Sequence, residues 1–145
     1  LVRQNLIYLI HMVPDFHCPV HIFCGEHPVR HYFYSLNKEG KKFSAHSFWD
    51  SSPAFKREGW TLERYAKEVD HISPKVAKKY CKGSVLKWAY DAVEQSNRLY
   101  TITPSNLEIT TMSQQKVEEI HALADEMILK GAYRLAYIIN DIFKK

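Results

Sequence analysis

Residues 113–143, SQQKVEEIHALADEMILKGAYRLAYIINDIF, form the longest stretch of the chain with an unbroken helical period. The stretch opens on Ser113, a residue type that caps helices because its hydroxyl accepts hydrogen bonds from the first free backbone N–H groups. One stripe of apolar and small residues runs along it: Val117, Ile120, Ala124, Met127, Gly131, Leu135, Ile138 and Ile142. Such a stripe is typical of a helix that faces a hydrophobic core. The sequence therefore predicts a core helix from Ser113 to Phe143.

Three shorter helices are predicted upstream of this core helix. Each begins with residues that are typical of helix starts: Thr for 61–72, Ser-Pro for 73–83 and Ser for 84–100. The stretch 101–111 is polar with a central proline and predicts a loop. Most of the second half of the chain is therefore expected to be helical.

The first half of the chain is less regular. Residues 2–13 carry apolar side chains at helical spacing and stop at Pro14, which predicts a largely buried helix. Residues 16–29 hold two prolines, three histidines and two cysteines without a period, which predicts a long structured loop.

A short hairpin is expected next. Residues 30–36 and 42–44 flank the turn sequence Asn-Lys-Glu-Gly, and Ser44 can cap a helix over residues 45–51 that Pro53 helps to end. The predicted fold class is all-α, a multi-helix domain with one small β-hairpin.

Composition limits the range of functions. The chain has 145 residues, 46% hydrophobic and 25% charged, which fits one globular domain, and no apolar run approaches the ~20 residues of a membrane span. The net charge of +4 favours anionic partners such as nucleic acid or phospholipid headgroups. Four lysines have the spacing of one helix face: Lys75, Lys78, Lys79 and Lys82. We interpret them as a solvated face, with phosphate binding as the alternative.

Two segments carry residues suited to binding a metal. In NLIYLIHMVPDFHCPVH, residues 5–21, His11 and Asp15 lie four apart and project from one helix face, and His21 follows. In SAHSFWDS, residues 44–51, His46 and Asp50 repeat that spacing. Imidazole and carboxylate are ligands that Zn²⁺ accepts, and a carboxylate such as Asp15 can bridge two ions. These spacings favour a zinc site.

These two segments resemble the zinc-binding segments of the zinc-dependent single-strand nucleases of the S1/P1 type, in the phospholipase C and nuclease superfamily. The family reads roughly His-x-x-x-Asp-x-His-x-Pro-Leu-His and then Asn-Leu-His-x-x-Trp-Asp. GAYRLAYIIN, residues 131–140, is similar to the family's closing helix. The resemblance implies a mostly α-helical fold, hydrolysis of phosphodiester bonds in single-stranded DNA or RNA, and a secreted or periplasmic location.

The resemblance also implies roles for individual residues. His11 and Asp15 match ligands of a deeply held zinc, and Asp15 reaches a further ion of a cluster of up to three zincs, which makes it the expected catalytic residue. His21, His46 and Asp50 match ligands of a more exposed zinc.

The family's remaining ligands lie in an upstream half that this sequence does not contain. The chain also opens on Leu rather than Met, so residues 1–145 are expected to be the C-terminal portion of a single nuclease-like domain, with a partial zinc site and incomplete or absent activity in isolation. Pro14 stands where the family has Gly, which is expected to kink the helix between His11 and Asp15.

Other interpretations of the same residues remain open. A phospholipase C-type phosphodiesterase of the same superfamily is one alternative, and a non-catalytic helical module with a vestigial metal site is another. We expect His17 to support the site rather than bind metal, and Trp49 to pack in the core. His121 and Asp125 are expected to form a helix-surface pair. The oligomeric state cannot be inferred from the sequence.

Overall fold

The computed structural model describes residues 2–22, 33–35, 42–44, 46, 49, 59–102 and 113–144. Its elements are α1 (Val2–Asp15), the 3₁₀ turn η1 (Pro19–His21), β1 (Phe33–Ser35), β2 (Lys42–Ser44), α3 (Leu62–Val69), α4 (Pro74–Cys81), α5 (Val85–Ile102) and α6 (Gln114–Ile142). This is the predicted all-α class with one small hairpin. None of the described helices is long and apolar enough to cross a lipid bilayer.

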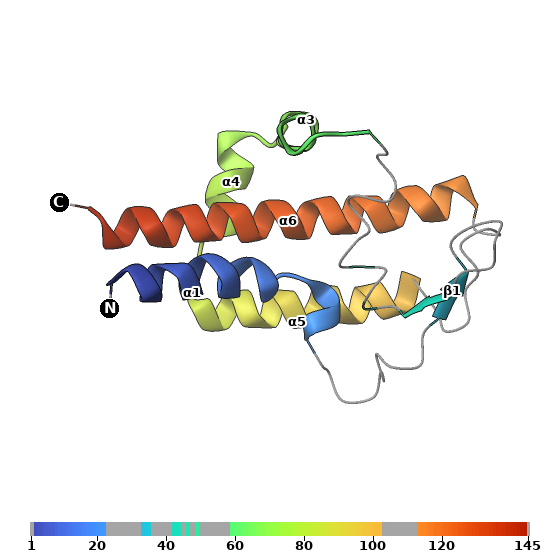
Figure 1. The fold of residues 1–145 in the computed structure, drawn as a ribbon, viewed down its shortest axis with the longest axis horizontal. Coiled ribbons are helices and arrows are strands. Elements are labelled where there is room, and N and C mark those ends of the chain that lie inside the picture. The colour runs from blue at the N-terminus through green and yellow to red at the C-terminus, as the bar shows by residue number, and fades with distance from the viewer. Residues whose placement is uncertain are drawn as a thin grey trace.

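Helix α6 is the axis of the fold. In Figure 1 it runs the length of the molecule, with α1 and α5 along one side and α3 and α4 along the other, and the two chain ends lie at the same end. Helices α1, α4 and α5 all contact it. Ser113 caps α6 as predicted, since its Oγ accepts a hydrogen bond from Lys116 N at 3.2 Å. The predicted core helix is confirmed almost to the residue.

The core lies mainly between α5 and α6. Leu99 of α5 and Ile120, Leu123 and Met127 of α6 are its largest fully buried side chains. Burying each apolar side chain of this size stabilises the fold by about 1.5–3 kcal/mol. Ile142, at the far end of the predicted stripe, is 59% exposed because it lies in the last turn of α6.

The caps of the shorter helices follow the sequence signals. Thr61 Oγ1 accepts from Arg64 N at 3.2 Å at the start of α3, and Ser73 Oγ accepts from Val76 N at 3.4 Å at the start of α4. Helix α3 ends at Val69, three residues before the predicted end at position 72. The helix cannot extend through position 73, because the residue before a proline avoids helical backbone angles and Ser73 is already the extended cap of the next helix.

The prediction that the first helix is largely buried is wrong. No residue of α1 is buried, and its exposed side chains include Ile7, Tyr8, Ile10 and Met12. Its apolar residues are distributed around the helix, and among the other helices α6 is its main neighbour. Nor does Pro14 end the helix, which continues to Asp15 because Phe16 N still bonds to Met12 O at 3.0 Å.

The predicted hairpin is confirmed. Strands β1 and β2 are antiparallel, with Phe33 opposite Ser44, Tyr34 opposite Phe43 and Ser35 opposite Lys42. Three other predicted segments lie mostly outside the described residues. The loop predicted over 16–29 is described only to residue 22, and the helix predicted over 45–51 only at positions 46 and 49. The loop predicted over 101–111 is described only at positions 101 and 102, which continue α5 instead. At position 49, Trp49 is 4% exposed and packs in the hydrophobic core.

Candidate metal centre

The chain reverses direction at the end of α1 and brings His21 back to Asp15. Backbone bonds from His17 N to Pro14 O (2.9 Å) and from Cys18 N to Asp15 O (3.0 Å) close the turn, and η1 follows. As a result, His21 Nδ1 lies 2.9 Å from Asp15 Oδ1 and 3.1 Å from the Asp15 carbonyl oxygen. The Asp15 carboxylate therefore fixes the orientation of the His21 ring.

The other side of the His21 ring faces His46. The two Nε2 atoms are 2.9 Å apart, and the rings meet edge to face with their centroids 4.8 Å apart. His21 Nδ1 faces oxygens, so it carries a hydrogen, and in a neutral ring Nε2 then accepts. His46 Nε2 is then the donor, an assignment inferred from the hydrogen-bond network. Asp15, His21 and His46 thus form a chain of contacts that joins two segments 25 positions apart.

The His21–His46 pair has the donor chemistry of a zinc site. Two imidazole nitrogens on one tetrahedral zinc lie roughly 3.3 Å apart, given Zn–N bonds of about 2.0–2.1 Å. The separation here is 2.9 Å, with a hydrogen between the nitrogens. A histidine that binds zinc through one nitrogen commonly donates from the other to a carboxylate, as His21 donates to Asp15. Even so, no three His, Cys, Asp or Glu side chains within the described ranges are grouped so as to hold a metal ion.

Of the two remaining predicted ligands, His11 is described and is not part of this contact chain. His11 is exposed on α1 and makes no hydrogen bond or ion pair with another described residue. Asp50 lies outside the residues that the structure describes. Of the five predicted ligands, the structure brings together three.

His17, between Asp15 and His21, has both ring nitrogens engaged. Its Nδ1 lies 2.6 Å from Val13 O, and its Nε2 lies 2.8 Å from a guanidinium nitrogen of Arg134. Because a guanidinium can only donate, Nε2 accepts and Nδ1 donates to the carbonyl. Burial lowers the pKa of His17 below its ordinary value, which agrees with a neutral ring. His17 therefore supports the turn, as expected, and has no nitrogen left for a metal.

Arg134 connects this turn to a buried ionic cluster. Its Nε donates to Tyr80 O at 2.9 Å and its Nη2 to Asp91 Oδ2 at 2.6 Å. Lys130 Nζ donates to Asp91 Oδ1 at 2.8 Å and lies 3.0 Å from Glu126. Burial alone would raise the pKa of Asp91, but the hydrogen bonds from Lys130 and Arg134 outweigh it and hold that pKa below its ordinary value. Asp91 is therefore ionised between two buried cations.

No motif in the sequence predicts this cluster. Its signal in the sequence is slight: Lys130 and Arg134 are four apart and border the apolar stripe of α6, where an unpaired charge would be costly.

Gly131 allows α1 to end against α6. A Cβ at this position would lie 3.4 Å from His17 Cβ and Cγ and 3.5 Å from Pro14 Cα. A single methyl group at this position would be in ordinary van der Waals contact with the turn, so the α6 backbone and the turn lie close together.

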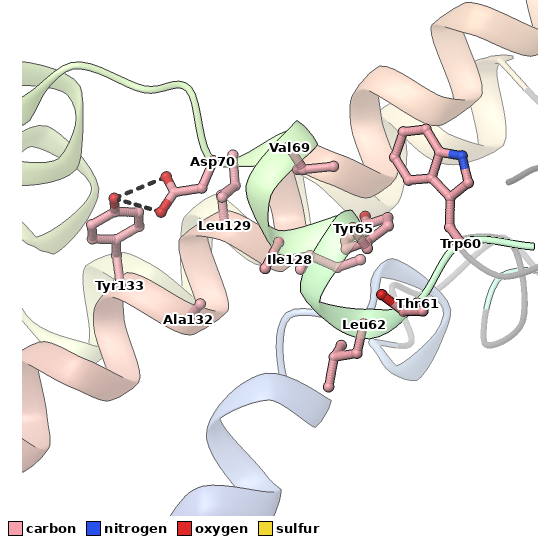
Figure 2. Close-up of a pocket in the computed structure, with 11 residues that line it drawn as sticks. Trp60, Thr61, Leu62, Tyr65, Val69, Asp70, Ile128, Leu129, Ala132 and Tyr133 are labelled. Atoms are coloured by element: carbon pink, nitrogen blue, oxygen red, sulfur yellow. Dashed lines mark hydrogen bonds between the residues drawn. The ribbon is translucent and has the colours of Figure 1, made fainter.

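An apolar cavity of about 540 Å³ lies on the opposite side of α6, where α3 crosses it. Figure 2 shows Trp60, Tyr65 and Ile128 around it, with the Tyr133 hydroxyl directed at the Asp70 carboxylate. Those hydrogen bonds measure 2.9 and 3.1 Å, and the hydroxyl of Tyr65 donates to Asp125 at 2.7 Å. Asp125 of α6 thus pairs with Tyr65 of α3. Neither His21 nor His46 is among the described residues that line this cavity.

Comparison with known proteins gives one result. The sequence model of the S1/P1 nuclease family matches residues 2–144, which is nearly the whole chain. No curated protein matches the chain, and no solved structure does. A match of this extent shows the family: the chain belongs to the S1/P1 nuclease family.

Proposed function

We propose that the chain contributes His21, His46 and Asp15 to a zinc-dependent phosphodiesterase centre that hydrolyses single-stranded nucleic acid. Membership of a nuclease family supports hydrolysis of nucleic acid. The observation that carries the zinc proposal is the 2.9 Å approach of the two imidazole Nε2 atoms, with Asp15 fixing one of the rings.

In this proposal the two imidazoles supply neutral nitrogen ligands. Because His21 donates from Nδ1 to Asp15, its Nε2 lone pair already faces the position between the rings. His46 has to move its hydrogen from Nε2 to Nδ1 before both lone pairs face the same point. Zinc, when bound, supplies an acidified water and neutralises charge on phosphate oxygens.

Asp15 has two tasks in this proposal. One carboxylate oxygen accepts the hydrogen of His21 Nδ1, and the other is available to a cation. We propose that His11 and Asp50 complete the ligand set, on the motif spacing alone. The extracellular or periplasmic location is likewise proposed from the family.

The proposed substrate is a nucleic acid rather than a phospholipid. The match to a nuclease family supports this choice, and the second motif ends in Asp50, whereas the phospholipase-like form tends toward Glu at that position. Hydrolysis of single-stranded DNA compared with hydrolysis of phosphatidylcholine separates the two activities, and turnover of the lipid alone would reject the nuclease proposal.

The metal content of matched histidine variants tests the centre directly. His21→Ala and His46→Ala should each lose zinc that the unchanged chain retains through dialysis. His71→Ala is the control, because His71 is exposed in the linker between α3 and α4. With Co²⁺ in place of zinc, the visible absorption of the bound ion should be altered by the first two substitutions only. Full zinc content in both His21→Ala and His46→Ala would refute the proposal.

A further inference from the structure

A cavity of about 510 Å³ lies between α4, α5 and α6 and has the chemistry of an anion site. Lys79, Lys82 and Lys87 line it and are exposed, whereas Lys130 and Arg134 line it and are buried. Two of the three exposed lysines belong to the basic helix face that the sequence showed.

The charges of this cavity divide into a neutralised floor and a cationic rim. At the floor, Lys130 and Arg134 both bind Asp91, and Lys130 also pairs with Glu126. At the rim, Lys79, Lys82 and Lys87 form no ion pair with any described residue. Glu94 is the one other carboxylate among the described lining residues. An anion entering the cavity therefore meets positive charge that the protein has not already neutralised.

Two of the rim lysines, Lys82 and Lys87, flank Gly83 in the turn between α4 and α5. Gly83 has φ +111°, and a Cβ there would lie 2.8 Å from Lys87 Cδ, so the aliphatic part of Lys87 packs directly on the turn. Trp88 Nε1 donates to the carbonyl oxygen of Lys82 at 3.4 Å and anchors the other side. Packing around this glycine therefore places the aliphatic part of Lys87, and the hydrogen bond from Trp88 places the backbone of Lys82.

Aromatic rings stand beside these cations. Tyr90 and Trp88 both line the cavity, and Tyr90 is 68% exposed whereas Trp88 is buried. Cationic side chains that follow a phosphate backbone, combined with rings on which bases stack, are how proteins bind single strands without reading sequence. A ligand that offered phosphate alone would gain nothing from Tyr90.

We infer that this cavity is a second contact site for single-stranded nucleic acid, in which Lys79, Lys82 and Lys87 bind phosphates and Tyr90 stacks on a base. The inference rests on the nucleic-acid substrate of the proposed function. Arg134 links the two sites: its Nη2 and Nε bind Asp91 and Tyr80 at the cavity, and its Nη1 binds His17 in the turn between Asp15 and His21. A nucleic acid bound in the cavity would therefore be separated only by the Arg134 side chain from the turn that carries the proposed zinc ligands.

The test measures binding without hydrolysis. Fluorescence anisotropy with a chelator present compares an oligothymidine of about 15 nucleotides with an abasic oligonucleotide of the same length, at low salt and at about 200 mM salt. The double variant Lys82→Gln/Lys87→Gln should bind both ligands about tenfold more weakly at low salt, with a salt dependence reduced by about 0.7 per lost contact. Tyr90→Ala should weaken oligothymidine about fivefold or more and leave the abasic strand unchanged.

The matched control is Lys67→Gln/Lys75→Gln, which removes the same charge from exposed lysines of α3 and α4 that do not line the cavity. Equal weakening by both double variants would show that only net charge matters and would overturn the site. Unchanged binding of oligothymidine by Tyr90→Ala would overturn the assignment to nucleic acid and leave a phosphate site. Because zinc is absent from the assay, failure of the metal centre does not alter these results.

Discussion

Arg134 and His17 are 117 positions apart in the sequence, and a guanidinium nitrogen of the first lies 2.8 Å from Nε2 of the second in the interior of the fold. This contact joins the last helix to the turn that carries Asp15 and His21. The same guanidinium binds Asp91 and the Tyr80 carbonyl, so α4, α5 and α6 share one anchor with the turn. The position of the candidate metal centre therefore depends on α6.

Replacing Arg134 should affect both stability and metal binding. Arg134→Met leaves Asp91 with one cation and removes the partner of His17, so the free energy of unfolding should fall by about 3–5 kcal/mol. Zinc affinity should fall as well, since His17 loses its anchor. Denaturant unfolding and zinc titration measure the two effects.

Lys130→Met is the control for that experiment. It removes the other cation on Asp91 without touching His17, so stability should fall while the zinc affinity of the folded protein is kept. Equal loss of zinc affinity in both variants would show that Arg134 acts on stability alone.

The contribution of Asp91 to stability should disappear in acid. Its pKa is lowered in the fold, so its ion pairs stabilise fully above its unfolded pKa of about 3.9 and are lost as the pH falls through the lower folded value. At neutral pH, Asp91→Asn should lower the free energy of unfolding by about 3 kcal/mol. This difference from the unchanged chain should shrink below about pH 4. If the difference in free energy of unfolding between the two proteins stays constant to within ~0.5 kcal/mol down to pH 2, an ionised Asp91 is contradicted.

Substitutions of Gly131 should show a steep dependence on size. Gly131→Ala places a Cβ in van der Waals contact with His17 at 3.4 Å and gains about 1 kcal/mol of helix propensity, so stability should hold or rise. Gly131→Leu has no space against Pro14 and His17 and should lose about 1–3 kcal/mol. Similar melting temperatures for both variants would show that α1 does not end against this part of α6.

The two other motif residues, His11 and Asp50, give a separate prediction. If His11 is a ligand, His11→Ala should lower the zinc content, and if Asp50 is one, Asp50→Ala should lower the rate of hydrolysis of single-stranded DNA at least about tenfold. Each substitution tests its own residue. Unchanged zinc in the first variant, or unimpaired cleavage in the second, would remove that residue from the ligand set.

Local signals in the sequence predicted most of the fold. Thr61, Ser73 and Ser113 cap helices where their hydroxyls precede a helical period, because a cap depends only on the next few residues. The hairpin could be predicted in the same way, because it depends on a short turn. The burial of α1 could not be predicted, since apolar residues distributed around a helix do not reveal how many neighbouring elements cover it.

Contacts between distant residues set the limit of sequence reasoning at the site. His21 and His46 could be paired only through the family resemblance, since 25 positions separate them and no local period connects them. Asp91 pairs with Lys130 and Arg134 across two helices, and composition gives no register between α5 and α6. Such pairings follow from tertiary packing, which propensity and spacing do not encode.

Anomalous diffraction at the zinc absorption edge, from crystals of the chain grown with zinc, tests the central claim most directly. The account predicts a peak within about 2.0–2.1 Å of both His21 Nε2 and His46 Nε2, with the two nitrogens separated to roughly 3.3 Å. A zinc peak bound elsewhere, with the two imidazoles still in hydrogen-bond contact, would contradict it.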